Sequence, residues 1–131
     1  MRILLLCILG LIMACSAERN TIVENRWVVV SYQLSDADSV RNAPQAYVLS
    51  FDDNRNFSFR LDVNTCGGSV NFQTNNIILF TQTPSCTEAC CDGVYSRAVL
   101  NALKEVNRYE LLNEQLTLTG NNGLRISLVK E

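Results

Sequence analysis

The feature that most constrains the fold is a strict alternation of apolar and polar side chains, clearest from Phe57 to Val63. In this FSFRLDV segment the apolar residues share one face, and the serine, arginine and aspartate share the other. Successive side chains of an extended strand point to opposite faces, so a period of two predicts a sheet with one buried and one wet side. The same alternation returns from Leu116 to Thr119 and from Leu124 to Leu128.

Further strands are predicted where β-branched and aromatic residues cluster between turn residues. They are Arg26–Leu34, Ala46–Phe51, Ser69–Gln73, Ile77–Thr83 and the short Tyr109–Leu112. We expect turns at Asn75-Asn76 and at Gly120–Gly123, and a bulge or tight bend at Gly67-Gly68. Seven or eight strands joined by short turns favour an antiparallel meander that curls or closes into a barrel.

One segment changes period and predicts a single amphipathic helix near residues 93–106. Apolar residues recur there at three- and four-residue spacing: Val94, Ala98, Val99, Ala102, Leu103 and Val106. The sequence does not fix the first residue of the helix, because Gly93 lies at its expected start. Ser85 with Glu88 has the spacing of a capping box, and Thr87 or Asp92 are alternative caps. The fold class is therefore mainly β, of the α+β kind.

The first 14 residues have the pattern of an export signal. Arg2 precedes an apolar run of about a dozen residues, which fits a signal-peptide core and is shorter than the roughly 20 needed to span a membrane. The run ends in Ile12-Met13-Ala14-Cys15, which resembles the lipobox of bacterial lipoproteins. That resemblance implies cleavage before Cys15 and acylation of Cys15, palmitate included. The alternative is an ordinary signal peptide cut near Ala17.

The export signal predicts three parts: a signal peptide at 1–14, a lipidated polar tether at 15–24 and a globular domain at 25–131. Two or more acyl chains anchor a protein stably. We therefore expect attachment to a membrane of the bacterial cell envelope, the outer membrane being the preferred one. The domain itself is expected to be monomeric.

Four cysteines lie in the expected domain, at positions 66, 86, 90 and 91. An exported chain meets an oxidising compartment, so we expect structural disulfides, and four cysteines allow three pairings. If Asn75-Asn76 is a hairpin turn, Cys66 lies nearly opposite Pro84 and close to Cys86. We therefore favour a bridge from Cys66 into the Cys86–Cys91 cluster. The alternatives are a zinc site, which the spacing opposes, and free or redox-active thiols.

Composition limits the function classes. The chain has 11 Lys and Arg against 13 Asp and Glu, so no broad basic field exists for nucleic acid, and we expect no nucleic-acid partner. Histidine is absent, which removes the usual general base and the commonest zinc ligand. Asp52 and Asp53 lie in a turn-rich DDNRN stretch, where Asp normally bonds to the backbone. We therefore expect no catalytic residue, no metal and no cofactor.

The order of several short motifs resembles the META domain family, the small domain of HslJ-like bacterial lipoproteins. These motifs are Arg26-Trp27-Val28, Thr65-Cys66-Gly67-Gly68, Thr83-Pro84-Ser85-Cys86, Ala102-Leu103 before Val106, Tyr109-Glu110-Leu111, Leu116-Thr117-Leu118 and Leu124-Arg125-Ile126. Two features depart from the family pattern: Thr65-Cys66-Gly67 replaces Gly-Cys-Asn, and Cys90-Cys91-Asp92 is a subgroup feature. The resemblance implies a lipocalin-like barrel with a helix packed against it, no catalytic residue, and an association with envelope stress.

Three functions follow. The favoured one is a non-catalytic, lipid-anchored envelope protein that contacts an unidentified protein or cell-wall partner. The second is a barrel that binds a small hydrophobic ligand among aromatic side chains, which on the simpler interpretation fill the core: Trp27, Tyr47, Phe51, Phe57, Phe59 and Phe72. The third is a thiol or redox protein that uses Cys66, Cys86, Cys90 and Cys91.

Overall fold

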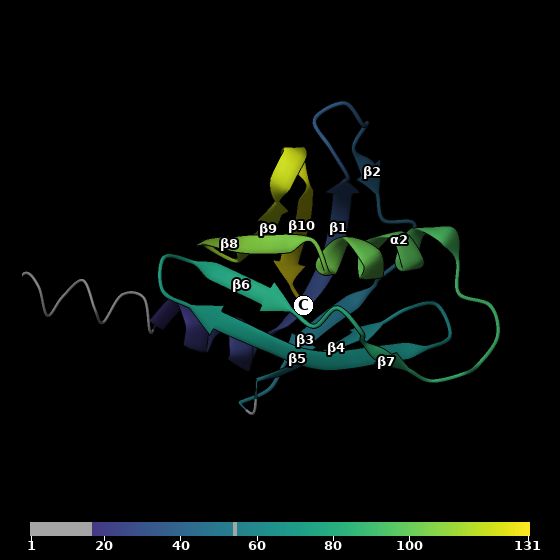
Figure 1. The fold of residues 1–131 in the computed structure, drawn as a ribbon, viewed down its shortest axis with the longest axis horizontal. Coiled ribbons are helices and arrows are strands. Elements are labelled where there is room, and N and C mark those ends of the chain that lie inside the picture. The colour runs from purple at the N-terminus through teal and green to yellow at the C-terminus, as the bar shows by residue number, and fades with distance from the viewer. Residues whose placement is uncertain (1–16, 54) are drawn as a thin grey trace, which may run out of the picture.

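A computed structural model describes residues 17–53 and 55–131, which form an antiparallel β-barrel with helices at its two ends (Figure 1). Eight strands close the barrel: β1 (Arg26–Gln33), β3 (Val48–Phe51), β4 (Asn56–Arg60), β5 (Thr65–Gln73), β6 (Ile77–Phe80), β8 (Val106–Leu112), β9 (Gln115–Gly120) and β10 (Arg125–Lys130). Pairing of β1 with β10 completes the ring. The predicted fold class and the strand count of the barrel are confirmed.

Two short strands are added to this ring. β2 (Arg41–Asn42) pairs with the end of β1, and β7 (Ser85–Cys86) pairs with the start of β5. Both extra strands lie in the two long connections of the chain, from β1 to β3 and from β6 to β8. Every other connection is a short turn, which is the meander that the turn residues predicted.

The strand order places the connections at two opposite ends. The turns β3–β4, β5–β6 and β8–β9 share one end with residues 17–24. The other end, here called the cysteine end, holds the β4–β5 turn (61–64), the β1–β3 and β6–β8 connections and the β9–β10 turn with η1 (Asn121–Gly123). All four domain cysteines belong to this second end or to the strand termini beside it.

The core follows the alternation seen in the sequence. Buried residues alternate along most of the barrel strands, with breaks in β1, β5 and β8. The buried set includes Trp27, Val29, Leu49, Phe59, Ile78, Leu116, Leu118, Ile126 and Leu128. Each fully buried side chain of this size contributes about 1.5–3 kcal/mol relative to an exposed one. The core therefore lies inside the barrel, and polar partners such as Ser58 and Thr117 face outward or sit at intermediate depth.

The segment expected to be a polar tether is partly helical, which corrects that expectation. Residues 17–24 form a helix whose Ile22 is fully buried. The Trp27 indole nitrogen donates a hydrogen bond to the Ile22 carbonyl at 2.9 Å. The polar composition of the segment hid this contact, because one apolar side chain and one backbone oxygen are enough to hold the helix on the core.

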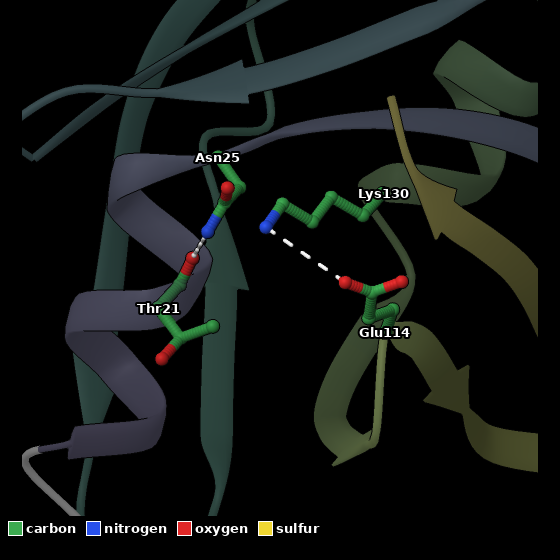
Figure 2. Close-up of polar contacts among 4 residues, drawn as sticks. All are labelled: Thr21, Asn25, Glu114 and Lys130. Carbon is green, nitrogen blue, oxygen red and sulfur yellow. Dashed lines mark hydrogen bonds and ion pairs between the residues drawn. The ribbon is translucent and has the colours of Figure 1, made fainter.

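Side chains also fix the end of this helix, as Figure 2 shows. Asn25 donates from its amide to the Thr21 carbonyl at 2.6 Å, which satisfies one of the free carbonyls of the last turn. Beside this helix, Lys130 at the end of β10 and Glu114 in the β8–β9 turn form a long ion pair at 3.9 Å between exposed side chains. An exposed pair of this length adds little to stability.

The second helix and two turns test further sequence predictions. α2 (Val94–Leu103) confirms the amphipathic helix, with Val99, Ala102 and Leu103 buried. The helix is shorter than predicted, because Val106 lies in β8, and Val94 is exposed rather than on the packed face. Asn75 and Asn76 both have positive φ, as a tight hairpin turn requires. The prediction of a bulge or tight bend at Gly67-Gly68 is wrong, because both glycines pair with β4 in unbroken register. A Cβ atom on Gly67 would lie 2.8 Å from the Phe57 carbonyl oxygen, so close strand approach explains that glycine.

Candidate functional site

The cysteine end gathers both disulfides of the described chain. Cys66, at the start of β5, pairs with Cys86 in β7, where the two residues face each other in antiparallel register. This agrees with the favoured bridge from Cys66 into the cluster. Cys90 and Cys91 pair with each other as neighbours in the chain. The first pair has a fully buried member, Cys66, whereas both members of the second pair are exposed.

Asp62, in the β4–β5 turn, connects three segments at this end. Its Oδ1 accepts hydrogen bonds from the Gln45 amide at 2.7 Å and from the Tyr47 hydroxyl at 3.0 Å. Its Oδ2 accepts from the Gly93 backbone N–H at 2.9 Å and from the Ser96 hydroxyl. The bond from Ser96, with those from Gly93 and Tyr47, outweighs desolvation and lowers the pKa of Asp62 below its usual value.

Asp62 also caps α2, and this corrects the predicted caps. The N-cap residue is Gly93, and no side chain of the N-cap bonds to the helix. The carboxylate of Asp62 fills that role from a turn 31 residues earlier, by accepting the Gly93 N–H. An anion near a helix N-terminus is favourable because free N–H groups point toward it. The proposed Ser85–Glu88 capping box does not form, since Ser85 lies in β7.

Asn64 connects the same turn to the segment that carries Cys90 and Cys91. Its Oδ1 accepts from the Thr87 hydroxyl and the Ala89 N–H, both at 2.8 Å. Its Nδ2 donates to the Ala89 carbonyl and to Asp92 Oδ2, both at 2.6 Å. Both amide hydrogens and both acceptor positions are thereby used, as a side chain with only 7% exposure requires.

Asp92 completes this cluster from the other side of the cysteine pair. Its Oδ1 accepts the backbone N–H groups of Val63 at 2.9 Å and of Asn64 at 3.0 Å. Desolvation raises the pKa of Asp92, but the bonds from Val63 and Asn64 and the charge of Arg97 lower it by more. The carboxylates of Asp62 and Asp92 and the amide of Asn64 are thus all hydrogen-bonded, and they hold the β4–β5 turn against the β1–β3 and β6–β8 connections. We refer to these three residues as the polar clamp.

Tyr95 fixes α2 to the strands at the cysteine end. Its ring stacks on Tyr47 at 5.4 Å between centroids and meets Tyr32 edge-on at 4.9 Å. Its hydroxyl donates to the Arg41 carbonyl at 3.1 Å. Burial, with smaller contributions from Tyr32 and Tyr47, raises the pKa of Tyr95 to about 12. The ring therefore stays neutral throughout the physiological range.

A groove of about 650 Å³ lies between α2 and the β9–β10 turn. Its walls include Leu34, Ala98, Ala102 and Leu124, with polar Asn101 and Glu105 at the helix side. Leu34 is 45% exposed, so part of this apolar wall meets solvent. The groove is outside the barrel, away from the aromatic residues that the sequence singled out.

The aromatic residues predicted to line a cavity or fill the core lie in the interior. Trp27, Tyr47, Phe51, Phe57 and Phe59 are buried, and Phe72 is partly buried against them. Phe57 meets Phe80 edge-on at 5.1 Å, and Phe72 lies between Phe51 at 5.6 Å and Tyr109 at 5.8 Å. Such contacts are the preferred geometry of packed rings. The rings thus make contacts with one another in the core.

The remaining predicted site residue, Cys15, lies outside the described residues. Within the described chain, no helix is long and apolar enough to cross a membrane. Nor do three or more His, Cys, Asp or Glu side chains come together there in a way that would hold a metal ion.

The META domain model matches residues 20–131. The chain belongs to the META domain family. This match starts inside the helix of residues 17–24, so part of that helix lies within the META domain. No curated protein matches the chain.

Solved structures share the fold of this chain. A protein from Burkholderia xenovorans, known from its NMR structure, superposes with a TM-score of 0.71 at 20% identity, over 88% of this chain and 87% of that one. A DUF4847 family protein from Bacteroides vulgatus ATCC 8482 gives 0.63 at 12% identity, over 82% and 93%. At these identities the likeness shows the fold alone.

Sequence reasoning missed the polar clamp of this META domain. The sequence indicates Asp92 only as an alternative helix cap and places Asp62 on the polar face of a predicted strand, and it assigns no role to Asn64. The strand in fact ends at Arg60. A signal for the turn was present in the D-V-N triplet at 62–64, because Asp and Asn bond to nearby backbone groups and favour turns. The segments that they join are distant in sequence, and no local pattern identifies them.

Proposed function

We propose that this META domain is a non-catalytic envelope module, anchored by lipid on Cys15, that acts through contacts of its outer surface. The observation that carries the proposal is the packing of aromatic rings inside the barrel, from Phe51 to Phe80 and Tyr109. An eight-stranded barrel is just wide enough to be filled by its own side chains. A filled interior leaves the outer surface and the two ends for contacts with a protein or cell-wall partner.

The lipid anchor is supported by the Ile12-Met13-Ala14-Cys15 sequence and by its place before the domain. The described domain starts only a few residues after Cys15, with the helix of residues 17–24. A lipid on Cys15 would therefore hold the end of the barrel that carries the helix of residues 17–24 close to the membrane. The cysteine end would then face away from it, toward the aqueous compartment.

Metabolic labelling with an alkyne fatty acid tests the anchor. Full-length wild-type protein is expected to take up the label, and Cys15→Ser is expected to take up none. Cys7→Ser is the matched control, since this cysteine lies inside the apolar run before the lipobox. Label on Cys15→Ser, or none on the wild type, would overturn the lipoprotein assignment.

A second candidate function is binding of a small apolar ligand in the groove beside α2. Its volume of about 650 Å³ falls in the range of small-molecule sites. Ala98→Trp would fill the groove, whereas Arg97→Trp adds the same ring to an exposed neighbouring position. If the groove binds apolar ligands, a fluorescent apolar probe binds the wild type and Arg97→Trp and is lost from Ala98→Trp. Equal binding to all three proteins, or no binding to any of them, would exclude the groove as an apolar-ligand site.

A further inference from the structure

The pair Cys90–Cys91 differs from Cys66–Cys86 in the exposure of its two members and in its place outside the sheet. Both of its cysteines are exposed, and residues 87–93 form neither strand nor helix. Cys66 is 1% exposed and lies in a strand that pairs on both sides. Attack on a disulfide requires that a thiolate reaches a sulfur atom along the bond, so access decides which bond exchanges. A bulky donor can therefore reach either sulfur of Cys90–Cys91, whereas in Cys66–Cys86 only the Cys86 side is exposed.

The backbone at the pair also has an uncommon conformation. Cys91 has φ of 98°, in the left-handed region that side-chain-bearing residues avoid. A residue persists there only where its surroundings hold it, and such positions concentrate at functional sites. In this chain the residues next to the pair, Ala89 and Asp92, are held by hydrogen bonds of the polar clamp.

The polar clamp holds the chain on both sides of the pair. On one side, Ala89 is bonded through its N–H and its carbonyl to Asn64. On the other, Asp92 accepts the N–H groups of Val63 and Asn64, and Gly93 donates to Asp62. Opening the Cys90–Cys91 bond therefore leaves the flanking residues in place. The two thiols stay adjacent, and closure is an intramolecular step with a high effective concentration.

We propose that Cys90–Cys91 is a redox-active site that exchanges electrons reversibly with a dithiol donor, while Cys66–Cys86 remains a structural bridge. A thiolate of the donor attacks one sulfur of the pair, forms a mixed disulfide and breaks the Cys90–Cys91 bond. The released thiolate takes up a proton. The second thiolate of the donor then attacks the mixed disulfide, which closes the donor's own disulfide and frees the second cysteine thiol. Two electrons and two protons pass from the donor to the pair.

This proposal does not depend on the lipid anchor or on the groove, and it concerns two of the four cysteines. The donor is identified by its chemistry alone, as a dithiol that closes into a disulfide. Reduction opens a bond beside the α2 N-terminus without breaking the bridge between β5 and β7.

The test uses the full-length protein in mixtures of reduced and oxidised dithiothreitol, quenched by acid and alkylated, with each cysteine assigned by mass spectrometry. Cys90 and Cys91 are expected to be alkylated together, at a dithiol-to-disulfide ratio at least tenfold lower than Cys66 and Cys86 require. After transfer to oxidised dithiothreitol, which accepts the two electrons and two protons, they should close again at a rate independent of protein concentration. Simultaneous opening of all four cysteines, earlier opening of Cys66–Cys86, or alkylation of Cys90 and Cys91 without reductant would overturn the proposal.

Two variants separate the polar clamp from simple exposure. Asp92→Ala removes the acceptor of the Val63 and Asn64 amides and is expected to slow closure of the reduced pair threefold or more. Glu88→Ala removes an acidic side chain from the same segment and is expected to leave the closure rate unchanged. Equal closure rates in Asp92→Ala and the wild type would show that the clamp does not position the thiols. In Cys90→Ser/Cys91→Ser, the titration of Cys66–Cys86 should be unchanged.

Discussion

At Asn64, a single amide side chain joins the β4–β5 turn to residues 25 and 28 positions later in the chain. It uses all four of its hydrogen-bonding positions while almost fully buried. Removing one partner of a buried bonded group costs about 1–3 kcal/mol, because the group left behind has lost its water as well. Residues of this kind are expected to be sensitive to small chemical changes.

Asn64→Asp should destabilise the fold at neutral pH and recover stability on acidification. The new carboxylate loses both donors and lies against the carboxylate of Asp92, so its pKa is expected to rise in the folded state. A raised pKa contributes stability that is present below the unfolded value near 4 and is lost as pH rises through the folded value. Thermal unfolding from pH 3 to pH 8 measures this. Asn71→Asp, on the exposed face of β5, is the control and should show no such recovery.

Tyr95 supplies a prediction in the alkaline range. Its pKa is raised to about 12, whereas an unfolded tyrosine titrates near 10. Stability from this group is fully present below pH 10 and is lost as pH rises from about 10 to 12. Tyr95→Phe should therefore flatten the fall of stability across that range, as measured by urea unfolding at several pH values. A fall of equal steepness in both proteins would contradict the burial of the hydroxyl.

At the scale of elements, the eight barrel strands were predictable, whereas the two-residue strands β2 and β7 and the short helix of residues 17–24 were not. Alternation identified β4, β9 and β10, and the three- and four-residue spacing identified α2. These elements can be recognised in the sequence because about half of their residues face a common core, which gives a periodic pattern of apolar side chains. The helix of residues 17–24 rests on Ile22 and on the bond from Trp27, so its pattern was too short to stand out.

Ile22→Ala tests whether this helix is part of the folded domain. Loss of a fully buried isoleucine should lower the free energy of unfolding by about 2–5 kcal/mol. Asn20→Ala, on the exposed face of the same helix, should change it by less than about 0.5 kcal/mol. Denaturant titrations give both values. A change at Ile22 as small as that at Asn20 would mean that the segment does not pack on the core.

For the whole molecule, the sequence predicted the barrel and a bridge from Cys66 into the Cys86–Cys91 cluster, but not which cysteine of the cluster is the partner. The hairpin at Asn75-Asn76 sets the register that brings Cys66 near Cys86, although β7 is displaced by two residues from the register of β5 and β6. The polar clamp depends on the path of the β6–β8 connection, which pairs with β5 through β7 and so passes against the β4–β5 turn. Contacts of this range are a property of the assembled fold.

The two disulfides should differ in their effect on global stability. Cys66–Cys86 closes a loop of 20 residues, so removing both cysteines by Cys66→Ala/Cys86→Ala should cost about 3 kcal/mol in the chain-entropy model. Cys90→Ser/Cys91→Ser removes a bond between neighbours that closes no loop, and should cost far less. Urea unfolding of the two double variants compares them directly. Equal losses would contradict the structural role given to Cys66–Cys86.

The central claim is that a filled META barrel is held at a membrane by lipid on Cys15. The most direct test is the intact mass of the protein isolated from its native membrane. The account predicts a chain that begins at Cys15 and carries the added mass of acyl groups on that residue. An unlipidated chain, or one that begins at another residue, would contradict it.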